Sequence, residues 1–269
     1  MCVLYKQILM PVVPAQANST FQQSAKFLQE LGANHLHLVH VMSEGLANRW
    51  QLEQWLTDMA KEIESKTGCL VTWELLSGHP PTEICETAEN RDMDIIYQWS
   101  KQRGILSRTL LGSTSSDVLR MTEKPALIHK ALPSAQDNYR INRILFATDF
   151  AEAASRTLEH LKLFSHLGAG LVLMHVRSRG ADPATDRRWQ EKAEKRLEEL
   201  ATDLQPYFPG LVTRVKVGAP GGVILEASRQ EEVELMLLGR YNNPSILKGM
   251  GGTVEKVVNK SQASVLVIP

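Results

Sequence analysis

The sequence Gly239-Arg-Tyr-Asn242 is followed, after nine residues, by Gly252-Thr253. An earlier stretch, Trp99-Ser-Lys-Gln102, is followed at the same spacing by Gly112-Ser113. The chain therefore contains the same loop twice. The second copy keeps small residues that allow a backbone to approach a phosphate group closely, whereas the first copy has lost most of them.

The repeat extends beyond this loop. Gly78-His-Pro80 matches Gly218-Ala-Pro220, and these two stretches are as far apart in the sequence as the two loops are. Leu31-Gly-Ala33 matches Leu167-Gly-Ala169 at a slightly smaller offset. Such small changes of offset indicate loop insertions, which cost little stability. A period of half the chain is too long for a solenoid repeat and fits two whole domains. We therefore predict one domain over residues 1–135 and a second over residues 141–269.

The composition is that of an ordinary globular protein, with 43% hydrophobic and 22% charged residues among 269. Lysine plus arginine number 30, as do aspartate plus glutamate, so no basic excess indicates nucleic-acid binding. No apolar run is long enough to span a membrane, and the first residues do not resemble a signal peptide. The three cysteines are widely spaced and odd in number, which is typical of reduced thiols. We expect a cytoplasmic protein.

Short apolar runs alternate with amphipathic stretches in both halves, which predicts strands alternating with helices. The strands expected in the first half are Gln7–Val13, His35–Val41, Leu70–Leu75, Asp94–Gln98 and Ala126–His129. Those expected in the second half are Arg143–Thr148, Leu171–Val176, Val212–Val217, Glu234–Leu238 and Val265–Ile268. Such alternation requires right-handed crossovers and a parallel sheet covered on both faces. The predicted fold class is α/β, with two tandem, open, doubly wound sheets of five parallel strands.

The helices of the second half are expected at Ala151–Leu167, Asp186–Leu204, Gly222–Arg229 and Val254–Asn259. In the first of these helices, the 3.6-residue period predicts a single buried face. That face would consist of Ala154, Leu158, Leu161 and Phe164.

A candidate site lies at the carboxyl ends of the second-half strands, where ligands of open α/β sheets bind. Asp149 follows the first strand, and its carboxylate can accept hydrogen bonds from ribose hydroxyls or an adenine amino group. Gly252-Thr253 begins the last helix, where unpaired N–H groups and the helix dipole favour phosphate oxygens. These residues together predict a nucleotide site.

The pattern G-x-x-G-(nine)-G-[ST] after a fourth strand, with an aspartate after the first strand, resembles the universal stress protein family. Here asparagine at 242 replaces the second glycine. Further similarity lies in Ile144-Leu-Phe-Ala-Thr-Asp149, Leu173-Met-His-Val176 and Ser264-Val-Leu-Val-Ile268. The resemblance covers essentially the whole chain as two fused copies. It implies an adenine-nucleotide α-hydrolase-like fold and a cytoplasmic stress-response protein.

The resemblance also implies an ATP site in the second half, with or without Mg²⁺. Adenine and ribose would lie against Ala147, Thr148 and Asp149, with Val176 lining the base pocket and Leu238 close to the nucleotide. The residues expected around ribose and phosphates are Gly239, Asn242, Gly252, Thr253 and Val254. No residue is recognisable as a base for an attacking water, so we expect no catalytic residue and at most slow ATP hydrolysis.

Family dimers pair through their last strands, so the resemblance implies that the two halves form an internal pseudo-twofold pair. Whether two such chains form a homodimer stays open. In the first half, Val13 replaces Asp149, while Trp99 and Gln102 replace the loop residues Gly239 and Asn242. We expect this half not to bind ATP. The alternative is a nucleotide-independent protein that binds a small molecule, a lipid or a protein partner through the less polar pocket of the first half.

Three histidines of the first half, His35, His37 and His40, are expected to pack in the sheet or at its edge rather than bind a metal. The first two share one face of a strand, whereas His40 lies on the other face. The chain also lacks the Cys-x-x-Cys and His-Glu-x-x-His patterns of metal sites.

Overall fold

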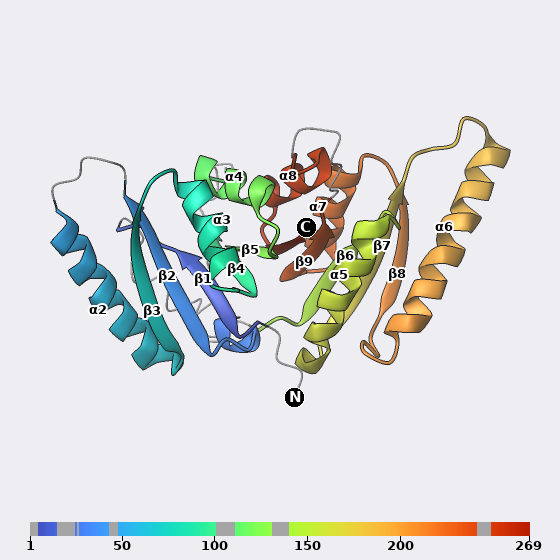
Figure 1. Ribbon diagram of the computed structural model, residues 1–269. Coiled ribbons are helices and arrows are strands. Elements are labelled where there is room, and N and C mark those ends of the chain that lie inside the picture. The colour runs from blue at the N-terminus through green and yellow to red at the C-terminus, as the bar shows by residue number, and fades with distance from the viewer. Residues whose placement is uncertain are drawn as a thin grey trace. The chain divides into compact units, whose positions relative to one another are not determined.

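The computed structural model describes residues 5–14, 25, 27–42, 48–100, 111–130, 140–240 and 249–269. These residues fall into two compact units: the described residues up to 130 form the first unit, and residues 140–269 belong to the second. Figure 1 labels the elements of both units. Among the described helices, none is both long enough and apolar enough to cross a membrane.

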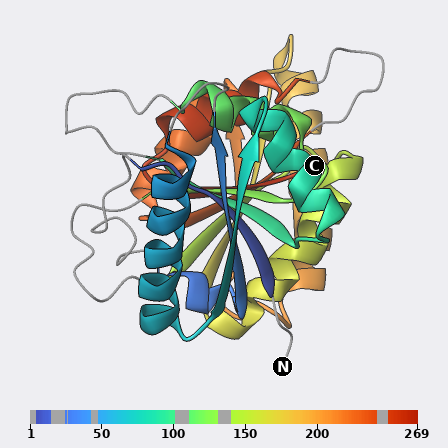
Figure 2. The same ribbon diagram turned by 60° about the vertical axis from the view of Figure 1, so that its left-hand side comes forward.

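The first unit contains five parallel strands in the order β3-β2-β1-β4-β5. The strands are β1 (Gln7–Pro11), β2 (His35–Met42), β3 (Leu70–Ser77), β4 (Ile95–Ser100) and β5 (Ala126–Lys130), and the labelled helices are α2 (Arg49–Thr67), α3 (Pro80–Asn90) and α4 (Ser113–Met121). Helices α2 and α3 lie on opposite faces of these strands, as Figures 1 and 2 both show. The unit is therefore doubly wound.

The second unit repeats this arrangement, with five parallel strands in the order β10-β9-β6-β7-β8. The strands are β6 (Arg143–Ala147), β7 (Gly170–Arg177), β8 (Val212–Val217), β9 (Leu235–Gly239) and β10 (Ser264–Ile268). The helices are α5 (Glu152–Leu163), followed by the 3₁₀ turn Phe164–Leu167, then α6 (Pro183–Leu204), α7 (Pro220–Gln230) and α8 (Gly252–Lys260). Strand β6 pairs with both β7 and β9, so the strand order reverses beside β6.

Local sequence explains where several elements begin and end. Proline occupies the first turn of α3, α6 and α7, where its missing N–H group costs nothing. Asp182 caps α6 by accepting hydrogen bonds from the N–H groups of Ala184 and Thr185, each at 3.0 Å. Strands β5 and β10 are buried along their whole length, as expected for strands of a parallel sheet with both faces covered.

The predicted fold class is confirmed, and every predicted strand is present with its ends shifted by no more than two residues. The buried face predicted for α5 was wrong at one position, because Thr157 is fully buried while Leu158 is only partly buried. Burial of Thr157 is tolerated because its hydroxyl donates to the carbonyl oxygen of Ala153 at 2.8 Å. The pseudo-twofold pairing of the two units stays a prediction.

Candidate functional site

The carboxyl ends of β6 and β9 border a cavity of about 270 Å³, which we call the second-unit cavity. It lies beside the point where the strand order reverses, as expected for a ligand site in an open α/β sheet. Its walls also include the end of β7 and the first turns of α5, α7 and α8. Nine of the ten residues predicted for the nucleotide site line it, and Asn242 lies outside the described residues. The nine are Ala147, Thr148, Asp149, Val176, Leu238, Gly239, Gly252, Thr253 and Val254.

The turn between β6 and α5 places Asp149 at the edge of this cavity. The Oδ1 atom of Asp149 accepts a hydrogen bond from the Ala151 N–H group at 2.9 Å, and the Thr148 hydroxyl accepts one from the Phe150 N–H group at 2.9 Å. Asp149 is exposed, and its Oδ2 atom has no hydrogen-bond partner in the described part of the chain. One carboxylate oxygen therefore stabilises the turn, while the other is available to accept from a ligand.

Phe150 stabilises the same turn in an unusual conformation. Its φ of 61° lies in the left-handed region, which is uncommon for a bulky residue. The ring contacts the His175 imidazole, at a centroid distance of 4.5 Å, and the Arg196 guanidinium, which lies 4.4 Å from the ring centre. His175 also contacts the Thr148 carbonyl oxygen through Nδ1 at 2.8 Å. His175 and Arg196 therefore position the turn that carries Asp149, and no pattern in the sequence indicates this role.

The start of α8 supplies hydrogen-bond donors to the cavity. The first helical hydrogen bond runs from the Glu255 N–H group to the Gly251 carbonyl oxygen at 2.9 Å, and no side chain caps the helix. The N–H groups of Gly252, Thr253 and Val254 therefore have no partner among the described residues. Such groups, together with the positive end of the helix dipole, attract anionic oxygens.

The two glycines of the predicted loop differ in what their surroundings require. A Cβ atom at Gly252 would meet nothing within 4 Å, so packing in the described structure does not demand glycine there. A Cβ atom at Gly239 would lie 3.0 Å from the Ala153 Cβ and 3.0 Å from the Thr157 Oγ1. Close packing of α5 on β9 therefore favours glycine at position 239, whether or not a ligand is bound. At Gly252, the lack of a side chain chiefly affects the space in the cavity.

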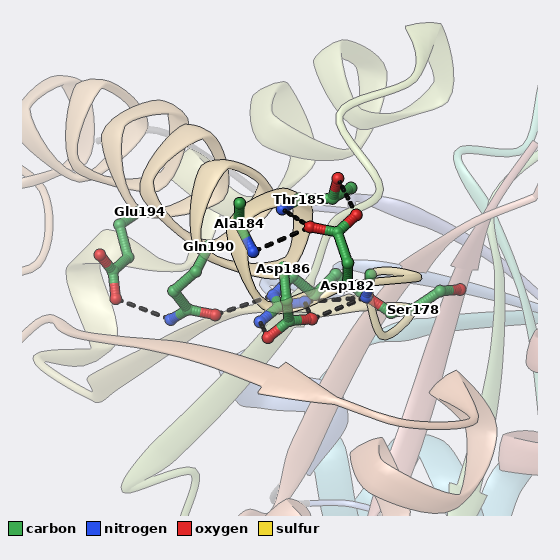
Figure 3. A network of polar contacts seen from close by, with 9 residues as sticks. Ser178, Asp182, Ala184, Thr185, Asp186, Gln190 and Glu194 are labelled. Carbon is green, nitrogen blue, oxygen red and sulfur yellow. Dashed lines mark hydrogen bonds and ion pairs between the residues drawn. The ribbon is translucent and has the colours of Figure 1, made fainter.

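A polar network anchors the segment that follows Val176 (Figure 3). The buried Arg177 guanidinium donates from Nη1 and Nη2 to the two carboxylate oxygens of Asp186, at 2.6 and 3.0 Å, and from Nε to Gln190 at 2.8 Å. These hydrogen bonds hold the pKa of Asp186 well below its usual range. The Gly180 N–H group also donates to Asp186, at 2.7 Å. The network ties the end of β7, and with it one wall of the cavity, to the first turn of α6.

Several lining residues were missed by the sequence-based prediction: Phe146, Ala153, Ala154, Pro220, Ile224, Met250 and Gly251. A signal existed for Pro220 and Ile224, because Pro80 and Ile84 are their counterparts in the first copy of the repeat. No comparable signal existed for Met250, which is buried although it stands among glycines before α8.

The histidines of the first unit make local polar contacts. His35 and His37 both contact the Thr72 hydroxyl, at 2.7 and 2.8 Å, while His40 contacts the Val12 carbonyl oxygen at 2.8 Å. Within the described ranges, no group of three or more histidine, cysteine, aspartate or glutamate residues is placed to hold a metal ion.

Comparison with known proteins identifies the family. The model of the universal stress protein family matches residues 4–130 and, a second time, residues 140–269. The chain belongs to the universal stress protein family. Its two family domains are arranged in tandem, and membership of this family supports nucleotide binding in general.

Individual relatives agree with this assignment. Universal stress protein MJ0577 of Methanocaldococcus jannaschii is 24% identical over 151 residues, which cover 47% of this chain and 93% of the relative. A universal stress protein structure from Archaeoglobus fulgidus matches 99% of this chain and 97% of its own, with 22% identity and a TM-score of 0.77. The PA1789 structure from Pseudomonas aeruginosa matches 99% of this chain and 93% of its own, with 17% identity and a TM-score of 0.71. These two structures show that the fold extends over the whole chain.

Proposed function

We propose that this universal stress protein binds ATP, or another adenine nucleotide, in the second-unit cavity and not in the first unit. One observation carries the proposal. The uncapped start of α8, with open space at Gly252, borders the same cavity as the available Oδ2 atom of Asp149. Donors suited to phosphate and an acceptor suited to ribose or adenine therefore line one cavity.

The lining favours a definite orientation of the nucleotide. Val176, Ile224 and Leu238 give the cavity an apolar wall, against which an adenine ring would be buried. Asp149 Oδ2 would accept from a ribose hydroxyl or the adenine amino group. The N–H groups at the start of α8 and the Thr253 hydroxyl would donate to phosphate oxygens.

The same lining argues against efficient hydrolysis. Asp149 is the only titratable side chain among the residues that line the cavity in the described structure, and one of its oxygens is engaged in the turn. A water attacking the terminal phosphate would therefore have no other protein base nearby. We expect ATPase activity to be slow at most, and any Mg²⁺ to be held chiefly by the phosphates.

Membership of the universal stress protein family supports a proposal for the cellular role. We place the protein in the cytoplasmic stress response, where nucleotide occupancy of the second unit would alter a surface that faces a partner. Within the described part of the chain, the Cys69 thiol is free, which agrees with a reducing compartment.

The two units provide a matched pair of variants that tests nucleotide binding. Gly252 and Gly112 occupy equivalent positions in the repeat, at the starts of α8 and α4, and a Cβ atom at either would meet no atom of the described residues within 4 Å. Isothermal titration with ATP should show that Gly252→Val abolishes binding, because the new side chain enters the space of the phosphates. Gly112→Val should bind ATP like the unmodified chain. Equal binding by Gly252→Val, or its loss in Gly112→Val, would refute the assignment.

A further inference from the structure

Two histidines of the first unit form a polar cluster near the amino ends of β2 and β3, whereas a cavity of about 230 Å³ lies at the carboxyl ends of the strands of this unit. Strand β3 is the last in the strand order, so the cluster lies at the outer edge of the sheet. His35 and His37 both contact the Thr72 hydroxyl of β3. On β1, Gln7 contacts His35 through its side chain and Asp94 through its N–H group. Because a hydroxyl has one hydrogen, Thr72 can donate to one imidazole and accept from the other only while at least one ring is neutral.

The second ring nitrogen of His37 faces an ion pair. His37 is 1% exposed, and its Nε2 atom lies 3.4 Å from Glu74 Oε2 without making a hydrogen bond to any described residue. The same carboxylate oxygen accepts from Nε and Nη2 of Arg91, at 2.9 and 2.7 Å, where Arg91 is the C-cap of α3. Protonation of His37 would therefore place a buried positive charge beside Arg91, with Glu74 shared between the two cations.

The fold favours the neutral form of both histidines. Burial, followed by the charge of Arg91, lowers the pKa of the His37 imidazole below its ordinary value of 6.5, although Glu74 acts in the opposite direction. The same two causes lower the pKa of His35. As the pH falls below the ordinary value, the unfolded edge binds protons before the folded edge does. Acid therefore removes stability from this edge until the folded histidines are protonated as well.

The second unit provides an internal comparison. The repeat places Val172 and Val212 where the first unit has His37 and Thr72, and each pair occupies the same register between equivalent strands. Gly170 stands at the position of the other histidine. All of these positions are described, and they place no imidazole at this edge of the second unit.

The ion pair is kept in the second unit with its polarity reversed. In the first unit, the carboxylate of Glu74 lies on the strand and the guanidinium of Arg91 lies at the helix end. In the second unit, the guanidinium of Arg214 lies on β8 and the carboxylate of Glu231 is at the C-cap of α7, with 3.0 Å between Nη2 and Oε1. Only the polarity of the first unit sets a carboxylate beside an imidazole. The histidines and the reversed pair therefore occur together, which indicates a role beyond joining a strand to a helix.

We propose that this cluster makes the outer edge of the first unit sensitive to acid: proton uptake by His35 and His37 releases β3 and the end of α3, while the second unit stays folded. The two imidazole rings lie 6.3 Å apart, so the protonated rings and Arg91 would bring three positive charges around the one carboxylate of Glu74. Release of an edge strand exposes backbone groups that can pair with another chain. This proposal is independent of nucleotide binding in the second unit.

Hydrogen exchange of the full chain, read by mass spectrometry of its peptides, compares the two units within one molecule. Measurements at about pH 7 and about pH 5 span the range in which histidine titrates, and the rates are corrected for the intrinsic effect of pH. Peptides of β3 and of the end of α3 should open several-fold more often at the lower pH. Peptides of β8 and of the end of α7, which carry the reversed ion pair without histidines, should not.

The matched variant combines His35→Gln with His37→Val and so removes both titrating rings. Its opening at β3 should no longer depend on pH, whatever its overall stability. His129 on β5, whose pKa is lowered to about 3 by burial, is present in both chains and cannot account for a difference between them.

A second measurement needs no variant. In the unmodified chain, the imidazole ¹⁵N signals of His35 and His37 should titrate below the ordinary pKa, and the amide signals of β3 should change with the same midpoint. The proposal is overturned if β3 opens equally at both pH values, if β8 opens as much as β3, or if the double variant keeps the full acid response.

Discussion

At the scale of the residue, Asp149 combines a structural and a ligand-binding role in one carboxylate. Oδ1 accepts from the Ala151 N–H group, and Oδ2 is available at the cavity edge. Asparagine at this position can keep the first contact through its amide oxygen while losing the second acceptor. The substitution therefore separates the two roles, which alanine would remove together.

We expect Asp149→Asn to weaken ATP binding on the order of tenfold to a hundredfold, the usual effect of losing a hydrogen bond to a charged group. The thermal unfolding midpoint without nucleotide should remain close to that of the unmodified chain, because the turn is retained. Isothermal titration and calorimetric unfolding measure the two quantities. Unchanged ATP affinity would show that Asp149 serves the turn alone.

Substitution of Gly239, unlike that of Asp149, should lower the stability of the fold. Its Cα atom faces Ala153 and Thr157 of α5, so Gly239→Val overpacks this contact and should cost about 1–3 kcal/mol of stability. Gly252→Val, whose side chain meets open space, should change stability by no more than about 0.5 kcal/mol. Denaturant unfolding of both variants measures the difference. Equal stability of the two would show that α5 does not pack on Gly239 as described.

At the scale of the element, the junction of β7 and α6 depends on the ion pair between Arg177 and Asp186. The Arg177 guanidinium lowers the pKa of the Asp186 carboxyl below its ordinary value of 3.8, so the folded state favours the ionised form. The resulting stability is present in full above that ordinary value. It is lost as the pH falls through the lower pKa of the folded state.

We expect Asp186→Asn to be less stable than the unmodified chain at about pH 6, and the difference to shrink only below about pH 4, where the unfolded chain begins to bind a proton at this site. Denaturant midpoints measured from about pH 6 to about pH 3 give the difference directly. A difference that stays constant down to the lowest pH would contradict the lowered pKa.

The elements themselves were largely predictable from sequence, because buried parallel strands such as Leu235–Gly239 read as apolar runs. The exact packing of helices was less predictable. The burial of Thr157 on α5 depends on its hydrogen bond to the Ala153 carbonyl oxygen and on the close approach of Gly239, neither of which has a periodic signature. The contacts of the Phe150 ring with His175 and Arg196 depend on a backbone conformation that the sequence does not reveal.

At the scale of the whole molecule, duplication has produced two cavities with different chemistry. The resemblance to the universal stress protein family predicted which residues of the second half would meet, since nine of ten line one cavity. The internal repeat predicted that Val13 and Trp99 would make the first half less polar. Neither predicted that Gln98 Nε2 is buried without a hydrogen-bond partner among the described residues, because such burial is visible only in three dimensions.

The central claim, that one of two related units binds nucleotide, is tested most directly by counting ATP bound per chain. Equilibrium dialysis of the full chain against radiolabelled ATP should reach a plateau at one molecule per chain, and Gly252→Val should bind none. A plateau at two per chain would show that the first unit also binds ATP. No binding by the unmodified chain, or a full plateau for Gly252→Val, would contradict the site assigned to the second unit.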